Sequence, residues 1–80
     1  MDDWRLQGQE KFLTDVVLHR TKYQRYREGW DHDHCEFCGV KFSLDIPEAL
    51  KSGYVTLDNY HWICDSCFQD FNGLFRWKVE

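Results

Sequence analysis

The chain has 80 residues, is 42% hydrophobic and 18% aromatic, and carries a formal net charge of −4 at pH 7. This negative charge argues against a general nucleic-acid binder, because such proteins present a basic surface. Its length predicts a single domain, 1–80, whose core alone supplies only a few kcal/mol of net stability. The first 12 residues lack a basic region followed by an apolar run, and no stretch approaches the roughly 20 apolar residues that span a bilayer, so we expect a cytoplasmic protein without membrane association.

Residues 1–30 are predicted to form an N-terminal extension that packs on the rest of the domain. Residues 7–13 favour a short helix, and residues 16–23 are dense in β-branched side chains, which favours a strand. The apolar spacing also fits a helical stripe, so one long helix over residues 8–23 is an open alternative. We favour the short helix followed by the strand.

A short basic run formed by Arg20, Lys22, Arg25 and Arg27 follows. We interpret it as a solvated face that packs near the acidic second half of the chain. The alternative is a phosphate-binding patch, which would make the protein a nucleic-acid reader whose affinity falls steeply with salt.

Four cysteines form two Cys-x-x-Cys pairs, Cys35/Cys38 and Cys64/Cys67, with 25 residues between the pairs. Thiols at this spacing match a tetrahedral four-thiolate zinc site. Two disulfides or a redox dithiol are the alternatives, but reduced cytoplasmic thiols in such pairs bind metal more readily. Because a closed four-sulfur site leaves no open coordination position, we predict one structural zinc ion, Zn²⁺, rather than a catalytic one.

The residues between the two pairs predict a turn, a short helix and a hairpin. Gly39 permits the positive φ that a metal-binding knuckle needs after Cys38. Pro47 suits the first turn of a helix over PEALKS, closed by Gly53. Residues 54–63 alternate as two strands around a central turn. This stretch is short enough to fold back on itself.

The second cysteine pair opens a predicted helix. Phe68, Phe71 and Phe75 recur at helical spacing, and Asp65 and Ser66 suit the first turn of such a helix. The two cysteines therefore present their sulfurs at a helix N-terminus, whose dipole favours the thiolate form.

Residues 33–76 resemble the treble-clef zinc finger. The resemblance rests on three elements in order: a knuckle that ends Cys-x-x-Cys-Gly, a hairpin, and a helix whose first turn holds the second Cys-x-x-Cys. The fold class that this implies is a small, zinc-stabilised α+β domain with a treble-clef core over residues 31–80 and an N-terminal helix and strand. A zinc ribbon is the close competitor, but it would place Gly after Cys67, where Phe68 stands. The runs WDHDHCEFC and HWICDSCF also resemble small, single-domain bacterial proteins of uncharacterised function.

The run Asp31-His32-Asp33-His34 is the candidate for an enzyme site. It resembles a run in treble-clef nucleases of the HNH class, where one His acts as general base beside a divalent ion, so a metal-dependent nuclease is the alternative function. In those enzymes, however, the catalytic His lies on the hairpin, where this chain offers only His61. The plainer interpretation is that His32 or His34 donates a hydrogen bond to a cysteine sulfur or caps the entry to the knuckle.

The aromatic residues are expected to supply most of the core, with one or two left exposed as candidates for a partner surface. Trp62, Phe68 and Phe71 are predicted to build the wall around the zinc. We therefore predict a structural-zinc module without catalytic residues that acts as a protein-interaction or adaptor protein. A nucleic-acid-binding zinc finger is the second alternative.

Overall fold

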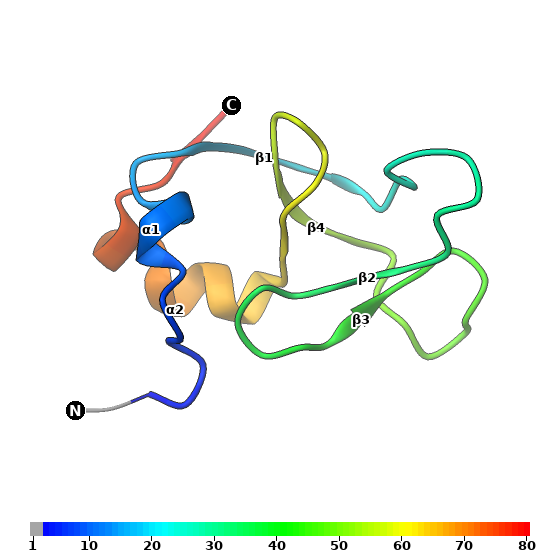
Figure 1. The fold of residues 1–80 in the computed structure, drawn as a ribbon, viewed down its shortest axis with the longest axis horizontal. Helices are drawn as coiled ribbons and strands as arrows, with labels where there is room; N and C mark the ends of the chain where they lie inside the picture. Colours follow the sequence, from blue (N-terminus) through cyan, green and yellow to red (C-terminus); the bar gives the residue numbers. More distant parts are fainter. Residues whose placement is uncertain (1–2) are drawn as a thin grey trace.

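A computed structural model describes residues 3–80 of the protein, and Figure 1 shows its ribbon. Within this range the chain forms two helices and six strands. In chain order these are α1 (Glu10–Leu13), β1 (Val17–Lys22), β2 (Asp33–His34), β3 (Lys41–Phe42), β4 (Ser52–Thr56), β5 (Trp62–Ile63), α2 (Asp65–Phe75) and β6 (Lys78–Val79).

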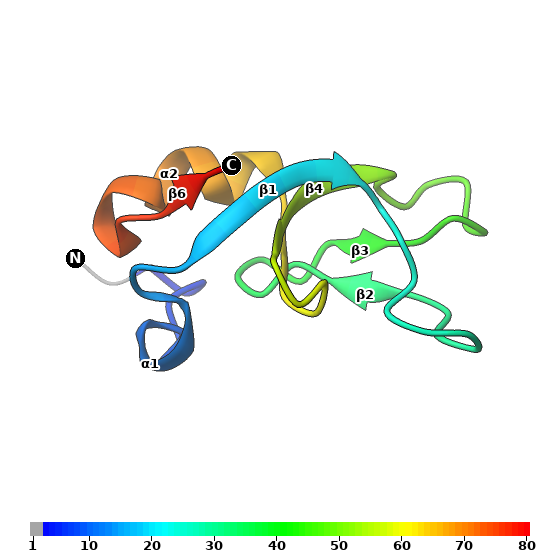
Figure 2. The same ribbon diagram turned by 90° about the horizontal axis from the view of Figure 1, so that it is seen from above.

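Four of the strands form one sheet in the order β5-β4-β1-β6. β1 runs antiparallel to β4, with Leu18 opposite Thr56 and Lys22 opposite Ser52. β6 forms the edge of the sheet opposite β5 and runs parallel to β1, beside which it lies in Figure 2. β2 and β3 form a separate two-stranded hairpin. A segment near each end of the chain therefore contributes a strand to the same sheet.

The four-stranded sheet is covered on both faces. Tyr54 in β4 points towards α2, where its ring stacks on Phe68 with a centroid separation of 3.7 Å. The preceding residue, Gly53, points to the opposite face, because successive strand residues alternate. There it meets the β2–β3 hairpin so closely that a Cβ atom at Gly53 would lie 2.7 Å from Cε1 of Phe42. The sheet thus lies between α2 and the β2–β3 hairpin (Figure 2).

The prediction of a short helix followed by a strand in the N-terminal part is confirmed, and the single long helix is wrong. α1 ends at Leu13, Thr14 is already extended, and Asp15 has a left-handed φ of +63°. The backbone after Asp15 then pairs with β4 over five positions. Strand pairing with a distant segment outweighs the helical spacing of the apolar residues.

The helix predicted from Pro47 is wrong, because the backbone of this segment is bonded to β3. Leu50 donates its amide to the carbonyl of Lys41, and its own carbonyl accepts the amide of Ser43. Gly53, expected to end a helix, lies inside β4. The segment is therefore a turn, which leads from the knuckle hairpin into the sheet.

The hairpin and the C-terminal helix are confirmed in their main features. β4 and β5 pair with Tyr54 opposite Ile63, and Asn59 takes a φ of +65° in the turn between them. α2 begins at Asp65 and ends at Phe75. Arg76 closes it in the left-handed conformation and donates its amide to the carbonyl of Asn72, after which the chain turns into β6.

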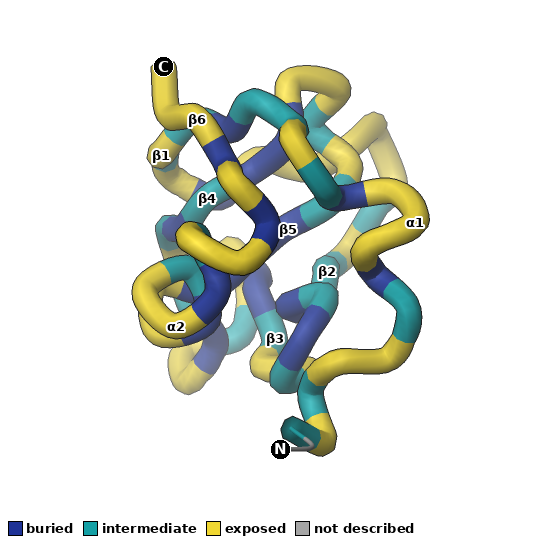
Figure 3. The backbone as a smooth tube through the Cα atoms, turned by 90° about the vertical axis from the view of Figure 1, so that its left-hand side faces the viewer, coloured by how far each residue is buried: buried dark blue, intermediate teal, exposed yellow. Residues whose placement is uncertain are grey.

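The core is predominantly aromatic, and Figure 3 shows its buried backbone positions. Trp62 is fully buried, and the buried Trp77 indole donates a hydrogen bond of 2.7 Å to the Leu13 carbonyl. No helix within residues 3–80 is long and apolar enough to cross a bilayer. The main cluster joins residues from all parts of this range: Leu13, Leu18, Tyr23, Phe37, Phe42, Val55, Trp62, Ile63, Phe71, Phe75 and Trp77 with three of the cysteines.

Candidate metal centre

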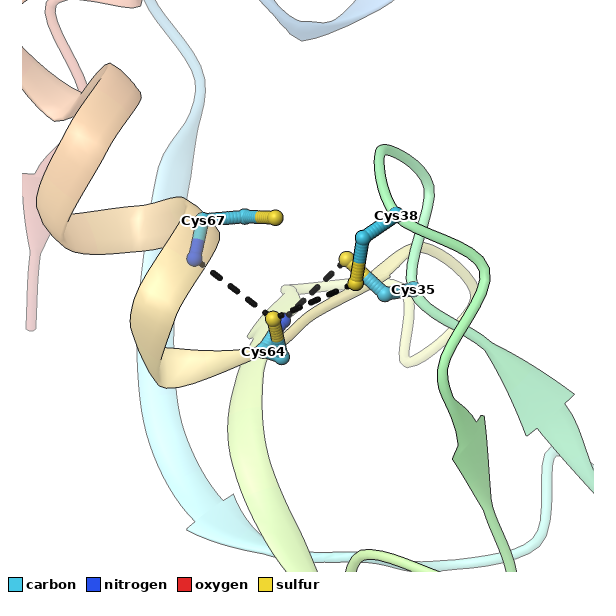
Figure 4. A group of neighbouring side chains, drawn as sticks. All are labelled: Cys35, Cys38, Cys64 and Cys67. Atoms are coloured by element: carbon cyan, nitrogen blue, oxygen red, sulfur yellow. Dashed lines mark hydrogen bonds between the residues drawn. The ribbon is translucent and has the colours of Figure 1, made fainter. Parts of the chain in front are cut away.

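The four cysteines come together at one point between the knuckle and α2, as Figure 4 shows. Their sulfur atoms all lie within 4.8 Å of one another. Cys35 and Cys38 come from the loop between β2 and β3, whereas Cys64 precedes α2 and Cys67 lies in its first turn. Such a group could hold a metal ion.

The first pair is positioned by a tight turn that the β2–β3 hairpin closes. The amide of Cys35 donates to the carbonyl of Val40 at 2.8 Å, and the amide of Gly39 donates to the carbonyl of Cys35 at 3.1 Å. Gly39 has a φ of +79°, as the knuckle required. The amide of Glu36 also donates to the carbonyl of Trp62 at 2.9 Å, which ties the turn to β5.

The second pair is positioned by the start of α2. Cys64 is the N-cap residue, with the extended backbone that a helix cap adopts, and its Sγ accepts the amide of Cys67 at 3.5 Å. A thiol thus takes the place of the usual hydroxyl or carboxylate cap. This arrangement aims the Cys64 sulfur at the positive end of the helix dipole.

Backbone amides also bond to the sulfur of Cys35. Its Sγ accepts the amide of Phe37 and the amide of Cys64, each at 3.4 Å. The second of these bonds runs from one cysteine pair to the other. Hydrogen bonds of this kind favour a sulfur that carries negative charge.

The pKa values of the thiols indicate that the cluster cannot ionise fully without a bound cation. Burial raises the pKa of Cys64 to about 11, and burial with the nearby Cys35 raises that of Cys67 further. Burial also acts to raise the pKa of Cys35, but the amides of Cys64, Cys38 and Phe37 outweigh it and lower that pKa. Four adjacent thiolates cannot exist here without a cation, because each disfavours ionisation of the next. A bound cation would take the place of the protons.

The geometry fits a tetrahedral four-sulfur site. Zinc–sulfur bonds of about 2.3 Å place the four sulfurs of such a site about 3.8 Å apart. The Cys38 and Cys64 sulfurs are 3.6 Å apart, and no separation within the group exceeds 4.8 Å. All four are free thiols, and 3.6 Å is far longer than a disulfide bond of about 2.05 Å. The observed cluster is therefore one of thiols, not disulfides.

Arg5 reaches this centre from the N-terminal segment, which sequence reasoning did not anticipate. Its Nη1 lies 3.6 Å from the Cys67 sulfur and 2.9 Å from Oδ2 of Asp70. Its Nη2 donates to Asp3 at 2.7 Å, and its guanidinium carbon lies 4.4 Å from the centre of the Phe71 ring. No sequence signal links positions 62 residues apart, so only the tertiary structure reveals this contact.

The aromatic surroundings differ in part from those expected. Phe71 is buried beside the centre, but its main partner is Phe37, which lies between the two knuckle cysteines with its ring 5.0 Å away. The ring of Phe68 lies between Tyr54 and Trp77. Phe37 is thus the aromatic residue of the centre that the sequence interpretation missed.

Trp62 belongs to the other face of the sheet. Its ring packs 5.0 Å from that of Tyr23 and 5.3 Å from that of Phe42. Its indole nitrogen is buried and has no hydrogen-bond partner among residues 3–80. The residue therefore forms part of the core between the sheet and the β2–β3 hairpin.

The histidines of the Asp31-His32-Asp33-His34 run do not bond to the cysteine sulfurs, contrary to one interpretation above. Nδ1 of His34 is 3.0 Å from the carbonyl oxygen of Gly39, and Nδ1 of His32 is 3.1 Å from Oδ1 of Asp31. The His34 side chain thus contacts the knuckle turn at the backbone carbonyl of Gly39.

The Asp33 side chain accepts hydrogen bonds from two aromatic residues of the fold. Its Oδ2 accepts the Tyr23 hydroxyl at 2.7 Å and the Trp30 indole at 2.9 Å. Across residues 3–80, the four cysteines are the only cluster of three or more cysteine, histidine or acidic side chains arranged closely enough to hold a metal ion. The Asp-His run therefore makes no second such cluster in this range.

His61 has a partner that the sequence did not reveal. Its Nδ1 lies 2.7 Å from Oε2 of Glu36, a residue of the knuckle. The imidazole also packs against the rings of Phe12 at 4.9 Å and Tyr60 at 4.8 Å. These contacts join α1, the knuckle and the turn between β4 and β5.

The basic run contacts acidic and aromatic side chains. Arg20 pairs with Asp65 at 2.8 Å, and Arg25 pairs with Asp45 at 2.9 Å. Arg27 lies over the ring of Trp30, 5.4 Å from its centre. Arg20 and Arg25 thus pair with acidic residues of the second half of the chain, as expected, whereas Arg27 contacts an aromatic ring of its own loop.

Comparisons with protein-family models, with curated proteins and with solved structures found no match to this chain. The treble-clef resemblance therefore rests on the cysteine spacing and on the order of the elements.

Proposed function

We propose that the protein is a small structural-zinc module of treble-clef type that acts through protein–protein contacts in the cytoplasm. The observation that carries the proposal is the gathering of four thiol sulfurs within 4.8 Å, three of them on buried cysteines. Cys35, Cys38, Cys64 and Cys67 would hold one ion. When bound, that ion would supply folding energy by cross-linking the knuckle to α2.

Zinc is the ion that this donor set favours. Four thiolates form a soft, closed site, which suits zinc rather than magnesium or calcium, both of which prefer oxygen. Four sulfur ligands fill a tetrahedral coordination sphere, so no position is left for water or substrate. The site is therefore proposed to be structural.

The order of the elements supports the treble-clef assignment. A hairpin with a glycine-closed knuckle (β2–β3) precedes the β4–β5 hairpin, and α2 follows with the second pair in its first turn. A zinc ribbon would carry a second knuckle where α2 begins.

The exposed aromatic residues support a role in protein binding. Tyr26, Trp30 and Tyr60 form an aromatic cluster at the surface, with ring centres 5.0 to 6.2 Å apart. Tyr26 and Tyr60 each keep 42% of their surface exposed. Tyrosine and tryptophan are enriched in protein interfaces, where their rings bury a large area and their polar ends remain bonded.

Elemental analysis with native mass spectrometry tests the metal assignment. We expect about one zinc per chain and no other metal in stoichiometric amount. Removing the ion with a chelator should collapse the dispersion of the amide NMR spectrum, because the ion would no longer cross-link the knuckle to α2. A metal-free protein that keeps its dispersed spectrum would contradict a structural role.

Capture of partners from a lysate of the source cell, with mass spectrometry of the retained proteins, tests the binding role. We expect a Tyr26→Ser/Tyr60→Ser double variant to lose a partner that the parent protein retains. Leu74→Ser provides the control, because Leu74 is 65% exposed and lies on α2, outside the aromatic cluster. Identical retention by the double variant and the parent would contradict the assignment of this surface.

A further inference from the structure

We propose that Arg5 is a positioning residue of the metal centre, whose guanidinium group holds the Cys67 thiolate in place and slows the release of the ion. The inference rests on the proposed function, because it concerns the same four-sulfur site. It adds a residue from the N-terminal segment to a centre otherwise built by the knuckle and α2.

Three of the four cysteine sulfurs accept hydrogen bonds from nitrogen atoms in the described part of the chain. Cys35 Sγ accepts two backbone amides, and Cys64 Sγ accepts one. In the described part of the chain, the only nitrogen donor to the Cys67 sulfur is Nη1 of Arg5, at 3.6 Å. Cys67 is only 1% exposed, so water cannot readily supply another. A side chain thus provides for Cys67 what the backbone provides for Cys35 and Cys64.

The guanidinium is held so that this nitrogen faces the sulfur. Nε and Nη2 donate to the two oxygens of Asp3 at 3.0 and 2.7 Å, which is the paired geometry of an arginine and a carboxylate. Nη1 is shared between Asp70 and Cys67, and the plane of the group lies against Phe71. The side chain keeps only 19% of its surface exposed. Lysine cannot reproduce this set of contacts, because its ammonium group has no planar fork.

The consequence is a link between the N-terminal segment and the metal. Groups that hydrogen-bond to metal ligands orient them, and their loss commonly weakens metal affinity by roughly 10- to 100-fold. If Arg5 leaves Cys67, the buried thiolate loses its only side-chain donor, and dissociation of that ligand becomes easier. The N-terminal segment would thus retard metal loss without supplying a ligand.

The test compares Arg5→Ala, Arg5→Lys and Arg20→Ala with the parent, all loaded with zinc. Arg20→Ala is the matched control, because Arg20 also pairs with an aspartate of α2, Asp65, but has no contact with a cysteine sulfur. The first readout is the rate of zinc transfer to an excess of a chromogenic chelator. The second is the sulfur-to-cobalt charge-transfer band of the Co²⁺-loaded proteins, which reports on hydrogen bonds to sulfur and not on fold stability.

We expect Arg5→Ala to release zinc roughly tenfold or more faster than the parent and to shift the charge-transfer band to longer wavelength. Arg20→Ala should match the parent in both readouts, and Arg5→Lys should release zinc at an intermediate rate. If Arg5→Ala does not fold, Arg5→Lys decides, and equality with the parent in both readouts would overturn the proposal. Equal behaviour of Arg5→Ala and Arg20→Ala would also overturn it while leaving the zinc site intact. A parent that binds no metal would overturn this proposal together with the proposed function.

Discussion

The two cysteine pairs reach the same point from unlike backbones. Cys35 and Cys38 lie in a turn between two strands of only two residues each, whereas Cys64 and Cys67 lie at the start of an 11-residue helix. Cys38 is half-buried, whereas Cys35, Cys64 and Cys67 are buried. The knuckle is held mainly by backbone hydrogen bonds and by the proposed ion at its sulfurs. The helix is held by its own hydrogen bonds and by aromatic packing. The knuckle half should therefore depend more on metal for its order.

Phe37 is the main exception to this division. It belongs to the knuckle, yet its ring packs against those of Phe71, Phe75 and Trp77 at 5.0 to 5.8 Å. One aromatic side chain therefore connects the knuckle half to the helix half.

The largest expected effect is the loss of a cysteine ligand from the helix half. Cys67→Ser would bury a hydroxyl in place of a thiolate, so we expect loss of zinc and largely unfolded protein. Cys38→Ser should be less severe, because water can reach the half-exposed position. Zinc stoichiometry and amide NMR dispersion measure both variants. A Cys67→Ser protein with an unchanged spectrum would show that the four-sulfur site is not required for folding.

Acidification should release the metal. In the metal-free protein the raised pKa of Cys64, about 11, and the still higher pKa of Cys67 mean that protons compete with the ion for these sulfurs. Metal binding therefore releases protons, and affinity must fall as the pH falls. A chelator-competition titration between pH 8 and about pH 5 measures this slope. Affinity that stays constant over that range would contradict thiolate ligation.

Removing the aromatic connection should be the next largest effect. Phe37 is 4% exposed, so Phe37→Ala leaves a cavity between the knuckle and α2 and should lower the free energy of unfolding by about 3–5 kcal/mol. Denaturant unfolding of the zinc-loaded protein measures it. A loss below about 1 kcal/mol would mean that the Phe37 ring contributes little to joining the two halves.

Gly53→Ala tests the contact between the sheet and the knuckle hairpin. The added methyl group would lie 2.7 Å from the Phe42 ring and 3.0 Å from the Ile63 carbonyl oxygen. Because Phe42 is fully buried, relief requires repacking, and we expect a loss of about 1–3 kcal/mol. Thermal unfolding followed by circular dichroism measures the change, and a variant as stable as the parent would contradict the close packing.

Gly39→Ala should give the smallest effect. Nothing lies within 4 Å of a Cβ atom at this position, so the cost is only that of a side chain at a φ of +79°. We expect about 1–2 kcal/mol from this strain, with zinc still bound. The same unfolding experiment, run beside Gly53→Ala, compares strain with crowding. Loss of zinc from Gly39→Ala would mean that the knuckle tolerates no strain.

The sequence alone determined the features that depend on neighbouring residues. The spacing of the cysteines indicated a single four-sulfur cluster, Gly39 indicated the knuckle turn, and the phenylalanine stripe indicated α2. The knuckle turn, the helix and the closeness of the two thiols within each pair follow from local geometry, because a turn or a helix fixes which side chains within a few residues lie together. The meeting of the two pairs was inferred from chemistry instead, because a tetrahedral zinc site takes four ligands.

The tertiary structure decided the contacts between distant segments. Residues 17–22 form a strand because they pair with β4. The segment after Pro47 does not form a helix, because its backbone is hydrogen-bonded to β3. Arg5 reaches Cys67, and Glu36 reaches His61, across 62 and 25 residues. Such contacts depend on how the elements pack together, and no local pattern encodes that arrangement. For this protein the cluster of four cysteines could be predicted from the sequence, whereas Phe71 alone was anticipated among the side chains around it.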